Sequence, residues 1–254
     1  MKKKIIVIIV IFLVFLTFFS GCNEQDNSPD SKLAKITNVS FTYEYNAEYE
    51  SLLLNITASI KNGQKCYYLC QDCIYFPSSI TFPTGGFPMM PIKDEQYSGL
   101  ITLNKNDTIL WCTVVANGYQ NDYDIYESII EIGDVTYNDD TSFTIGEVSY
   151  SDTYELFDSN VIDFSVDISN NDNITGVRLL ERYLTLFKND LFRFDAIGGN
   201  YIFGENDTYS SLLDIQKNYE DCGFEYRESI YFKIVAIDEN GNIAISPTNI
   251  YKIT

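Results

Sequence analysis

The sequence predicts an all-β fold: two tandem β-sandwiches behind an N-terminal signal or anchor. Three observations lead to this prediction. The 254 residues include 20 tyrosines and 17 phenylalanines, which are residue types enriched in strands. Short segments with alternating apolar and polar residues occur along the chain, and their order is found twice. No long segment carries the 3.6-residue periodicity of an amphipathic helix.

The first 22 residues have the three parts of a secretory signal. Residues 2–4 are lysines, residues 5–19 are apolar apart from Thr17, and small residues lead up to Cys22. The ending Phe-Ser-Gly-Cys resembles the lipoprotein box of prokaryotes, and this resemblance implies that Cys22 is lipidated and becomes the mature N-terminus. Two other hypotheses stay open, because the apolar run is nearly long enough to span a bilayer: an uncleaved anchor helix, or cleavage and secretion.

Residues 23–32 form the next segment, which we expect to be a flexible tether. It is rich in Asn, Asp and Ser and holds too few apolar residues to fold. Under all three hypotheses the rest of the chain lies outside the membrane. We therefore expect an extracytoplasmic protein that is attached to the membrane through a lipid or a helix.

The composition excludes several classes of function. The formal charge is −19, and removal of residues 1–21 takes away three lysines and no acid, which gives −22. Such a chain repels phosphate backbones, so we expect no nucleic-acid partner. There is no histidine, which excludes His-dependent catalytic triads and zinc sites with histidine ligands.

An internal repeat divides the chain. The matching segments are 36–41 with 145–150, 54–62 with 162–170, 97–103 with 209–215, and 112–116 with 232–236. They occur in the same order, and their offsets lie between 108 and 120 residues and change only by steps that loops can absorb. We predict two similar domains at 33–137 and 143–254, joined by a polar linker at 138–142.

Each repeat reads as a series of short strands. In residues 54–60, apolar residues alternate with Asn55, Thr57 and Ser59, which is the pattern of a half-buried strand, and residues 162–168 repeat it. Turn-forming Asn, Asp and Gly residues separate the strands. About seven strands in about 110 residues are typical of an immunoglobulin-like sandwich.

A more specific resemblance lies near the end of the second repeat. The pattern Phe232-x-Ile234-x-Ala236-x-Asp238-x-x-Gly241 resembles the penultimate strand and following turn of fibronectin type III and related bacterial immunoglobulin-like domains. This resemblance implies a β-sandwich without catalytic residues, of a kind that serves as a spacer, adhesin or ligand-binding module.

Four cysteines belong to the first repeat alone: Cys66, Cys70, Cys73 and Cys112. Outside the cell, structural disulfides are the default interpretation. We expect Cys112 to pair with one member of the triplet and the other two to pair with each other. The partner of Cys112 stays open, because four cysteines allow three connectivities. Cys222 is left over, as a buried thiol or a link to another chain.

A second hypothesis assigns chemistry to the same cysteines. Cys66, Cys70, Cys73 and Cys112 are able to bind one zinc ion as four thiolates, and Cys70-x-x-Cys73 resembles a redox pair. The triplet spacing also resembles the iron–sulfur motif of radical S-adenosylmethionine enzymes, but Asp72 replaces their usual aromatic residue. A redox or metal-dependent protein is therefore the alternative function.

Two further segments are candidate sites. Residues 75–91 hold four of the six prolines, and their apolar side chains Phe82, Phe87, Met89 and Met90 predict a stiff loop that docks a partner or packs as core. Asp238, Asn240 and Asn242 have the oxygen ligands of a calcium loop, although turn chemistry also explains them. Apart from this calcium, we expect no cofactor.

The sequence as a whole favours a non-enzymatic, membrane-anchored extracellular protein. It would act in binding or adhesion, or as a component of the cell envelope. The expected partner is a surface protein or a glycan, in addition to the membrane.

Overall fold

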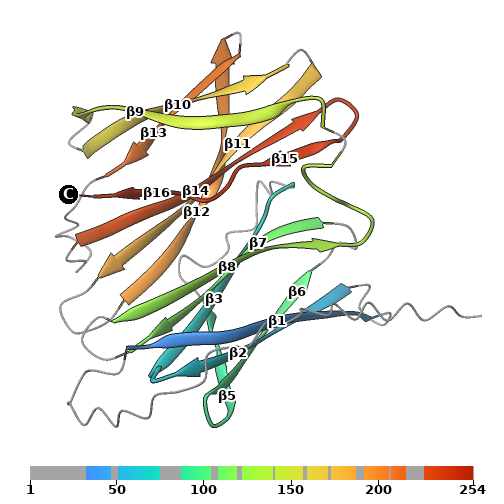
Figure 1. Cartoon of the computed structure of the whole chain (residues 1–254), viewed down its shortest axis with the longest axis vertical. Coiled ribbons are helices and arrows are strands. Elements are labelled where there is room, and N and C mark those ends of the chain that lie inside the picture. Colours follow the sequence, from blue (N-terminus) through green and yellow to red (C-terminus); the bar gives the residue numbers. More distant parts are fainter. Residues whose placement is uncertain are drawn as a thin grey trace, which may run out of the picture. The chain divides into compact units, whose positions relative to one another are not determined.

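The computed structural model describes residues 33–46, 51–74, 87–103, 108–118, 122–139, 141–156, 159–170, 173–186, 192–205, 207–215 and 226–253. Throughout these ranges the regular structure is antiparallel β-strand, without an α-helix. Figure 1 shows the strands stacked in layers. No helix that could cross a membrane occurs among the described residues.

Eight strands from the first repeat form the N-terminal half. They are β1 (Lys35–Asn46), β2 (Ser51–Lys61), β3 (Lys65–Asp72), β4 (Phe87–Pro88), β5 (Met90–Lys93), β6 (Gln96–Leu103), β7 (Thr108–Asn117) and β8 (Tyr123–Ile132). One sheet has the order β1-β2-β6-β5 and the other has the order β4-β3-β7-β8. This is the ABED and CFG arrangement of an immunoglobulin-type sandwich, with β4 as an added edge strand.

The remaining strands form the C-terminal half. They are β9 (Thr144–Leu156), β10 (Ser159–Ser169), β11 (Ile174–Leu186), β12 (Phe192–Glu205), β13 (Thr208–Asp214), β14 (Tyr226–Asp238), β15 (Ile243–Ile245) and β16 (Asn249–Lys252). The order is β9-β10-β13-β12-β11-β14, with β15 and β16 both paired to β14. Strand β12 pairs with β11 over most of its length and with β13 at its end. It therefore takes the places that β4 and β5 occupy in the N-terminal half.

The strand pairing agrees with the repeat seen in the sequence. Phe41 lies opposite Ile56 in the first hairpin, and the aligned residues Tyr150 and Phe164 lie opposite each other in the second. The all-β sandwich prediction is thus confirmed. By their internal contacts, residues 32–254 form one compact unit, and the division into two domains at 138–142 stays a prediction.

Each half encloses its own apolar core. Inward residues of β2, such as Leu54 and Ile56, pack with β3 and β7 in the first core. Phe164 and Phe232 pack in the second, with ring centroids 5.4 Å apart. The alternation of apolar and polar residues therefore predicted the buried faces of these strands.

A third apolar cluster joins the two halves. It contains Cys73, Ile109 and Trp111 from the N-terminal half, and Leu180, Val235, Ile243 and Ile245 from the C-terminal half. These side chains come from the outer faces of the β3–β7 and β11–β14 sheets, the faces that point away from the individual cores. We call this cluster the inter-half contact.

Three cations of the C-terminal half lie at the inter-half contact, and one of them, Arg178, donates a hydrogen bond to the carbonyl oxygen of Ile74. The guanidinium of Arg182 stacks 3.5 Å from the centroid of the Trp111 ring and donates hydrogen bonds to Thr113 Oγ1 and to the carbonyl oxygen of Trp111. Lys233 donates to the Ser246 carbonyl oxygen at 3.1 Å. Burial lowers the pKa of Arg182 to about 9, although Glu127 acts in the opposite direction. Arg182 therefore remains a cation at neutral pH.

The predicted linker begins with a residue that is bound to the C-terminal half. Asn138 has a positive φ of 58°, a conformation that asparagine tolerates well. Its backbone N–H donates to Ile243 O at 2.7 Å, and its side-chain Oδ1 accepts from Ile245 N at 2.9 Å. Asn138 thus extends the pairing at β15, and this part of the linker is not a free joint.

Candidate functional site

The structure divides the predicted docking loop into buried and exposed parts. Phe82 lies outside the described residues. Phe87 is half-buried and stacks on Tyr68, with ring centroids 5.4 Å apart. Met89 is buried in the N-terminal core, whereas Met90 is 68% exposed. Of the three described candidates, only Met90 offers its side chain to a partner.

One of the two predicted disulfides is present. Cys70 and Cys112 are joined, and their Cα atoms are 4.1 Å apart. They lie directly opposite each other on β3 and β7, inside the N-terminal core. The bridge therefore joins neighbouring strands of one sheet.

The second predicted bridge, between Cys66 and Cys73, is wrong, because both residues are free and buried. Successive side chains of a strand point to opposite faces. Cys66 accordingly lies in the N-terminal core and Cys73 in the inter-half contact. Two thiols on opposite sides of a sheet cannot meet without movement of the backbone.

The positions of the four cysteines also bear on the hypothesis that they form a metal or redox site. The thiols of Cys66 and Cys73 are separated by the sheet, and Cys70 and Cys112 are consumed in the disulfide. Burial raises the pKa of Cys66 and of Cys73 to about 12, so both thiols are protonated and poor nucleophiles. Within the described ranges, no three His, Cys, Asp or Glu side chains are placed to hold one metal ion.

The candidate calcium loop is a hairpin turn closed by a carboxylate. Asp238 Oδ1 accepts hydrogen bonds from the backbone N–H groups of Asn240 and Asn242, at 2.9 and 2.8 Å. Asp238 Oδ2 accepts from the Asn242 amide at 2.8 Å. Gly241 has a positive φ of 83°. Burial acts to raise the pKa of Asp238, but these hydrogen bonds outweigh it and lower the pKa. Turn chemistry thus explains these residues, and calcium binding stays a prediction.

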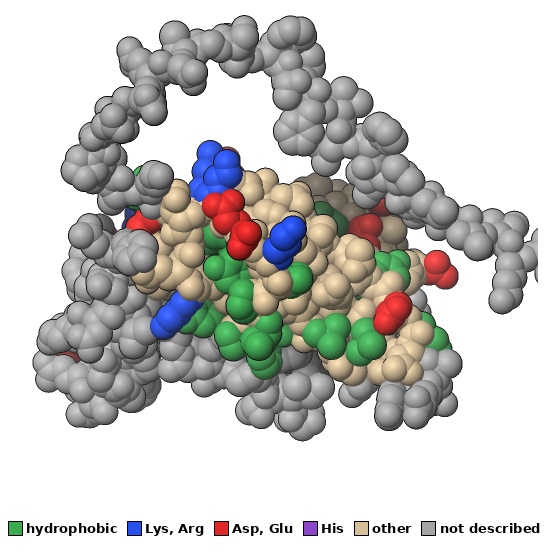
Figure 2. Space-filling model, turned by 90° about the horizontal axis from the view of Figure 1, so that it is seen from below, with side chains coloured by type: hydrophobic (Ala, Val, Ile, Leu, Met, Phe, Trp, Pro, Cys, Tyr) green, Lys and Arg blue, Asp and Glu red, His purple; other side chains and the backbone are tan. Residues whose placement is uncertain are grey.

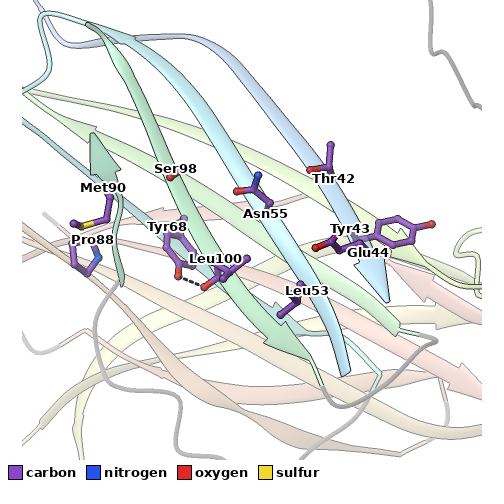
Figure 3. Close-up of a pocket in the computed structure, with 11 residues that line it drawn as sticks. Thr42, Tyr43, Glu44, Leu53, Asn55, Tyr68, Pro88, Met90, Ser98 and Leu100 are labelled. Carbon is purple, nitrogen blue, oxygen red and sulfur yellow. Dashed lines mark hydrogen bonds between the residues drawn. The ribbon is translucent and has the colours of Figure 1, made fainter. Parts of the chain in front are cut away.

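A shallow groove of about 650 Å³ crosses the outer face of the β1-β2-β6-β5 sheet. Figure 3 shows side chains of neighbouring strands side by side along it. The lining residues are Thr42, Tyr43, Glu44, Leu53, Asn55, Tyr68, Pro88, Met90, Ser98, Gly99 and Leu100. We call it the N-terminal groove. Viewed from below, from the side of the N-terminal half, the molecule shows hydrophobic side chains gathered among polar ones (Figure 2).

The floor of the N-terminal groove depends on Tyr68 and Gly99. The Tyr68 hydroxyl donates to the Leu100 carbonyl oxygen at 2.8 Å (Figure 3), and burial raises the pKa of Tyr68. A Cβ atom at Gly99 would lie 2.3 Å from the Tyr68 ring. A side chain at position 99 would therefore require the Tyr68 ring to move.

A related groove of about 560 Å³ lies on the equivalent face of the C-terminal half. Its lining residues are Ser149, Tyr150, Ser151, Asp163, Phe164, Ser165, Ser210, Ser211 and Leu212. Five of them align with N-terminal groove residues through the sequence repeat, namely Ser151 with Thr42, Asp163 with Asn55, Ser210 with Ser98, Ser211 with Gly99, and Leu212 with Leu100. Both halves thus have a groove on the equivalent outer face, but different side chains line the two grooves.

The sequence predictions did not include the N-terminal groove. A signal was present, however. Residues 52–54 are three consecutive leucines, and in a strand the middle one must point away from the core. Leu53 does so, and Leu100 on β6 is 58% exposed.

Cys22 and Cys222 lie outside the described residues.

No protein-family model matches the chain, and no curated protein is similar to it. Among solved structures, the chain is similar to one from a 1.5-MDa bacterial ice-binding adhesin, in a study of how that adhesin is retained at the host cell surface. The sequence identity is 11%, the TM-score is 0.26, and the match covers 85% of this chain and 64% of that one. A likeness this distant carries no argument about function.

Proposed function

We propose that the protein is a membrane-anchored extracellular binding protein that acts through the N-terminal groove and performs no catalysis. One observation carries this proposal. The N-terminal groove presents exposed apolar side chains, Met90 and Leu100, beside polar ones on the open face of a sheet. Exposed apolar side chains gathered at a groove are a common feature of binding sites.

The chemistry of the remaining residues supports binding over catalysis. The chain has no histidine, and its described free thiols are buried and protonated. Catalysis usually requires a nucleophile or base whose pKa is tuned toward neutral pH.

The anchor is the second part of the proposal. The segment that resembles a lipoprotein box ends at Cys22, and the polar segment 23–32 follows it. A lipid on Cys22 would hold the acidic β-structure at the outer surface of the membrane. In a bacterial host, Cys22→Ala should abolish incorporation of labelled fatty acid. Unchanged labelling would contradict lipidation at this residue.

The groove is tested by binding of the full chain, solubilised in detergent, to immobilised probes. The probes are neutral polysaccharides (mannan, chitin, dextran), anionic polysaccharides (hyaluronan, alginate) and the matrix proteins collagen and fibronectin. Leu100→Ser should weaken binding to at least one probe about tenfold, which corresponds to about 1.4 kcal/mol. Leu212→Ser, the aligned substitution in the other half, is the control and should leave binding unchanged. Equal effects of both substitutions, or of neither, would overturn the role of the groove.

A further inference from the structure

The outward side chains that line the N-terminal groove lie in regular rows across the strands. Thr42 lies opposite Asn55 on the neighbouring strand, and Asn55 lies opposite Leu100 on the next. Strands are about 4.8 Å apart, so this row spans about 10 Å across β1, β2 and β6. Ser98 and Met90 pair on β6 and β5 beside it. Polar and apolar groups thus lie beside one another at short, fixed intervals.

The two grooves differ in whether their polar groups are already hydrogen-bonded. In the C-terminal groove, Ser149 and Ser165 hydroxyls lie 2.7 Å apart. Asp163 Oδ1 accepts from the Tyr154 hydroxyl at 2.7 Å, and the Asp163 N–H donates to Ser151 Oγ at 3.1 Å. Ser149, Ser151, Asp163 and Ser165 are thus hydrogen-bonded within the sheet. Ser210, like its counterpart Ser98, makes no side-chain hydrogen bond to other described residues.

In the N-terminal groove, the aligned side chains Thr42, Asn55 and Ser98 make no hydrogen bond to other described residues. An amide and two hydroxyls offer donors and acceptors together. A ligand that hydrogen-bonds to them replaces water without breaking protein contacts. The N-terminal groove therefore has one amide and two hydroxyl groups available to bind a polar ligand.

The charge of the molecule restricts the ligand further. Glu44 is the only ionisable side chain apart from the two tyrosines in the groove lining, and the whole chain carries a formal charge of −19. An anionic ligand would be repelled by this field. Hydroxyl and amide groups beside Leu53 and Leu100 instead suit an uncharged ligand that carries both hydroxyls and apolar C–H surfaces.

We propose that the N-terminal groove binds a neutral polysaccharide chain. This inference rests on the proposed function and specifies its ligand class. Sugar hydroxyls would bond to Thr42, Asn55 and Ser98, while the C–H faces of the sugar rings pack on Leu100 and Met90. The labelled lining residues lie across the neighbouring strands β1, β2, β6 and β5 (Figure 3), and an extended chain would lie across these strands. A stable protein partner would instead need about 800 Å² of complementary surface with several aromatic anchors, whereas the lining has one exposed aromatic side chain, Tyr43, and the buried Tyr68.

Reciprocal substitutions test the ligand class with the same immobilised probes. Asn55→Asp introduces the residue and the charge of the C-terminal groove, and Asp163→Asn makes the opposite change. We expect Asn55→Asp and Leu100→Ser to weaken binding to a neutral polysaccharide about tenfold, with Asp163→Asn and Leu212→Ser unchanged. Binding should also be insensitive to salt, because no charge pair is formed. Asn55-Ile56-Thr57 is an N-glycosylation acceptor sequence, so the protein is expressed in a host without N-glycosylation. Unchanged unfolding midpoints confirm that the variants are folded.

The outcomes separate this inference from the proposed function. Groove-dependent binding of collagen or fibronectin alone, or of an anionic polysaccharide alone, would overturn the neutral-polysaccharide ligand and leave the binding function standing. Absence of groove-dependent binding to every probe would overturn both. Binding to a neutral polysaccharide that the two control substitutions weaken equally would place the site elsewhere.

Discussion

The two halves have a similar strand arrangement but different residues at equivalent positions in their cores and on their outer faces. In the cores, the cross-strand pair Cys70–Cys112 of the N-terminal half corresponds to Glu181 opposite Phe232 in the C-terminal half. One half joins this position by a disulfide, whereas the other places an aromatic ring in its core. Inward positions are therefore filled in different ways while the register stays the same.

The outer faces of the β3–β7 and β11–β14 sheets differ in charge. Aligned residues on these faces are neutral in the N-terminal half and include three cations in the C-terminal half: Tyr67 with Arg178, Gln71 with Arg182, Trp111 with Tyr231, and Thr113 with Lys233. Because the two faces pack on each other, the cations of one half meet the ring and the oxygen acceptors of the other. Two similar units thus become complementary through a few substitutions on one face.

The largest expected effect concerns the reactivity of the N-terminal thiols. At about pH 8, Cys66 and Cys73 should react with iodoacetamide roughly a thousandfold more slowly than in concentrated urea, since burial raises their pKa from 9.0 to about 12. Mass spectrometry of the modified peptides measures this difference. Their protonated state also stabilises the fold below about pH 9, and this contribution is lost as the pH rises toward 12. Rapid labelling in the native protein would show that the thiols are not buried.

Loss of Arg182 tests the inter-half contact. Arg182→Ala leaves the Trp111 carbonyl and the Thr113 hydroxyl without their donor and should destabilise the protein by about 3–5 kcal/mol. Urea unfolding followed by the fluorescence of Trp111, the single tryptophan, reports directly on this contact. Gln71→Ala at the aligned position is the control and should cost less. An equal cost for both would argue against a special role of the cation.

The disulfide is expected to matter to one half alone. Replacement of Cys70 and Cys112 by valine should lower the free energy of unfolding by about 2–4 kcal/mol, mainly because the unfolded chain gains freedom. Hydrogen exchange should speed up in β3 and β7, while β11 and β14 keep their protection. A loss of protection spread evenly over both halves would indicate that they unfold as one cooperative unit.

The smallest effect concerns the floor of the N-terminal groove. The C-terminal half combines Leu179 with Ser211 where the N-terminal half combines Tyr68 with Gly99. Gly99→Ser should cost about 1–3 kcal/mol, because the new side chain meets the Tyr68 ring. Tyr68→Leu in the same molecule should recover most of that loss in a double-mutant cycle. Additive costs would show that the two positions do not compensate each other.

Much of the fold could be predicted from the residues themselves. Alternation in residues 54–60 and 162–168 gave the inward faces of β2 and β10, because period-2 patterns reflect burial directly. The repeat alignment placed Cys112 at the position of Phe232, and both are fully buried. Val177–Leu186, a segment of mixed pattern, is part of β11.

The candidate site was harder to predict. Met90 was identified through its proline-rich segment, but Met89 from the same segment belongs to the core. Thr42 and Asn55 come from consecutive strands and Leu100 comes from the distant strand β6, and only the register of these strands brings the three residues into one row. A pattern within one strand does not contain this information.

The sequence by itself determined the all-β class, the repeated strand pattern and the acidity of the molecule, because these follow from composition and local periodicity. Tertiary structure decided which cysteine pairs with Cys112, which thiols stay free, and how the two outer faces pack around Arg182 and Trp111. The physical reason is that local alternation specifies which side of a strand is apolar. The partner that covers this side depends on long-range register and packing.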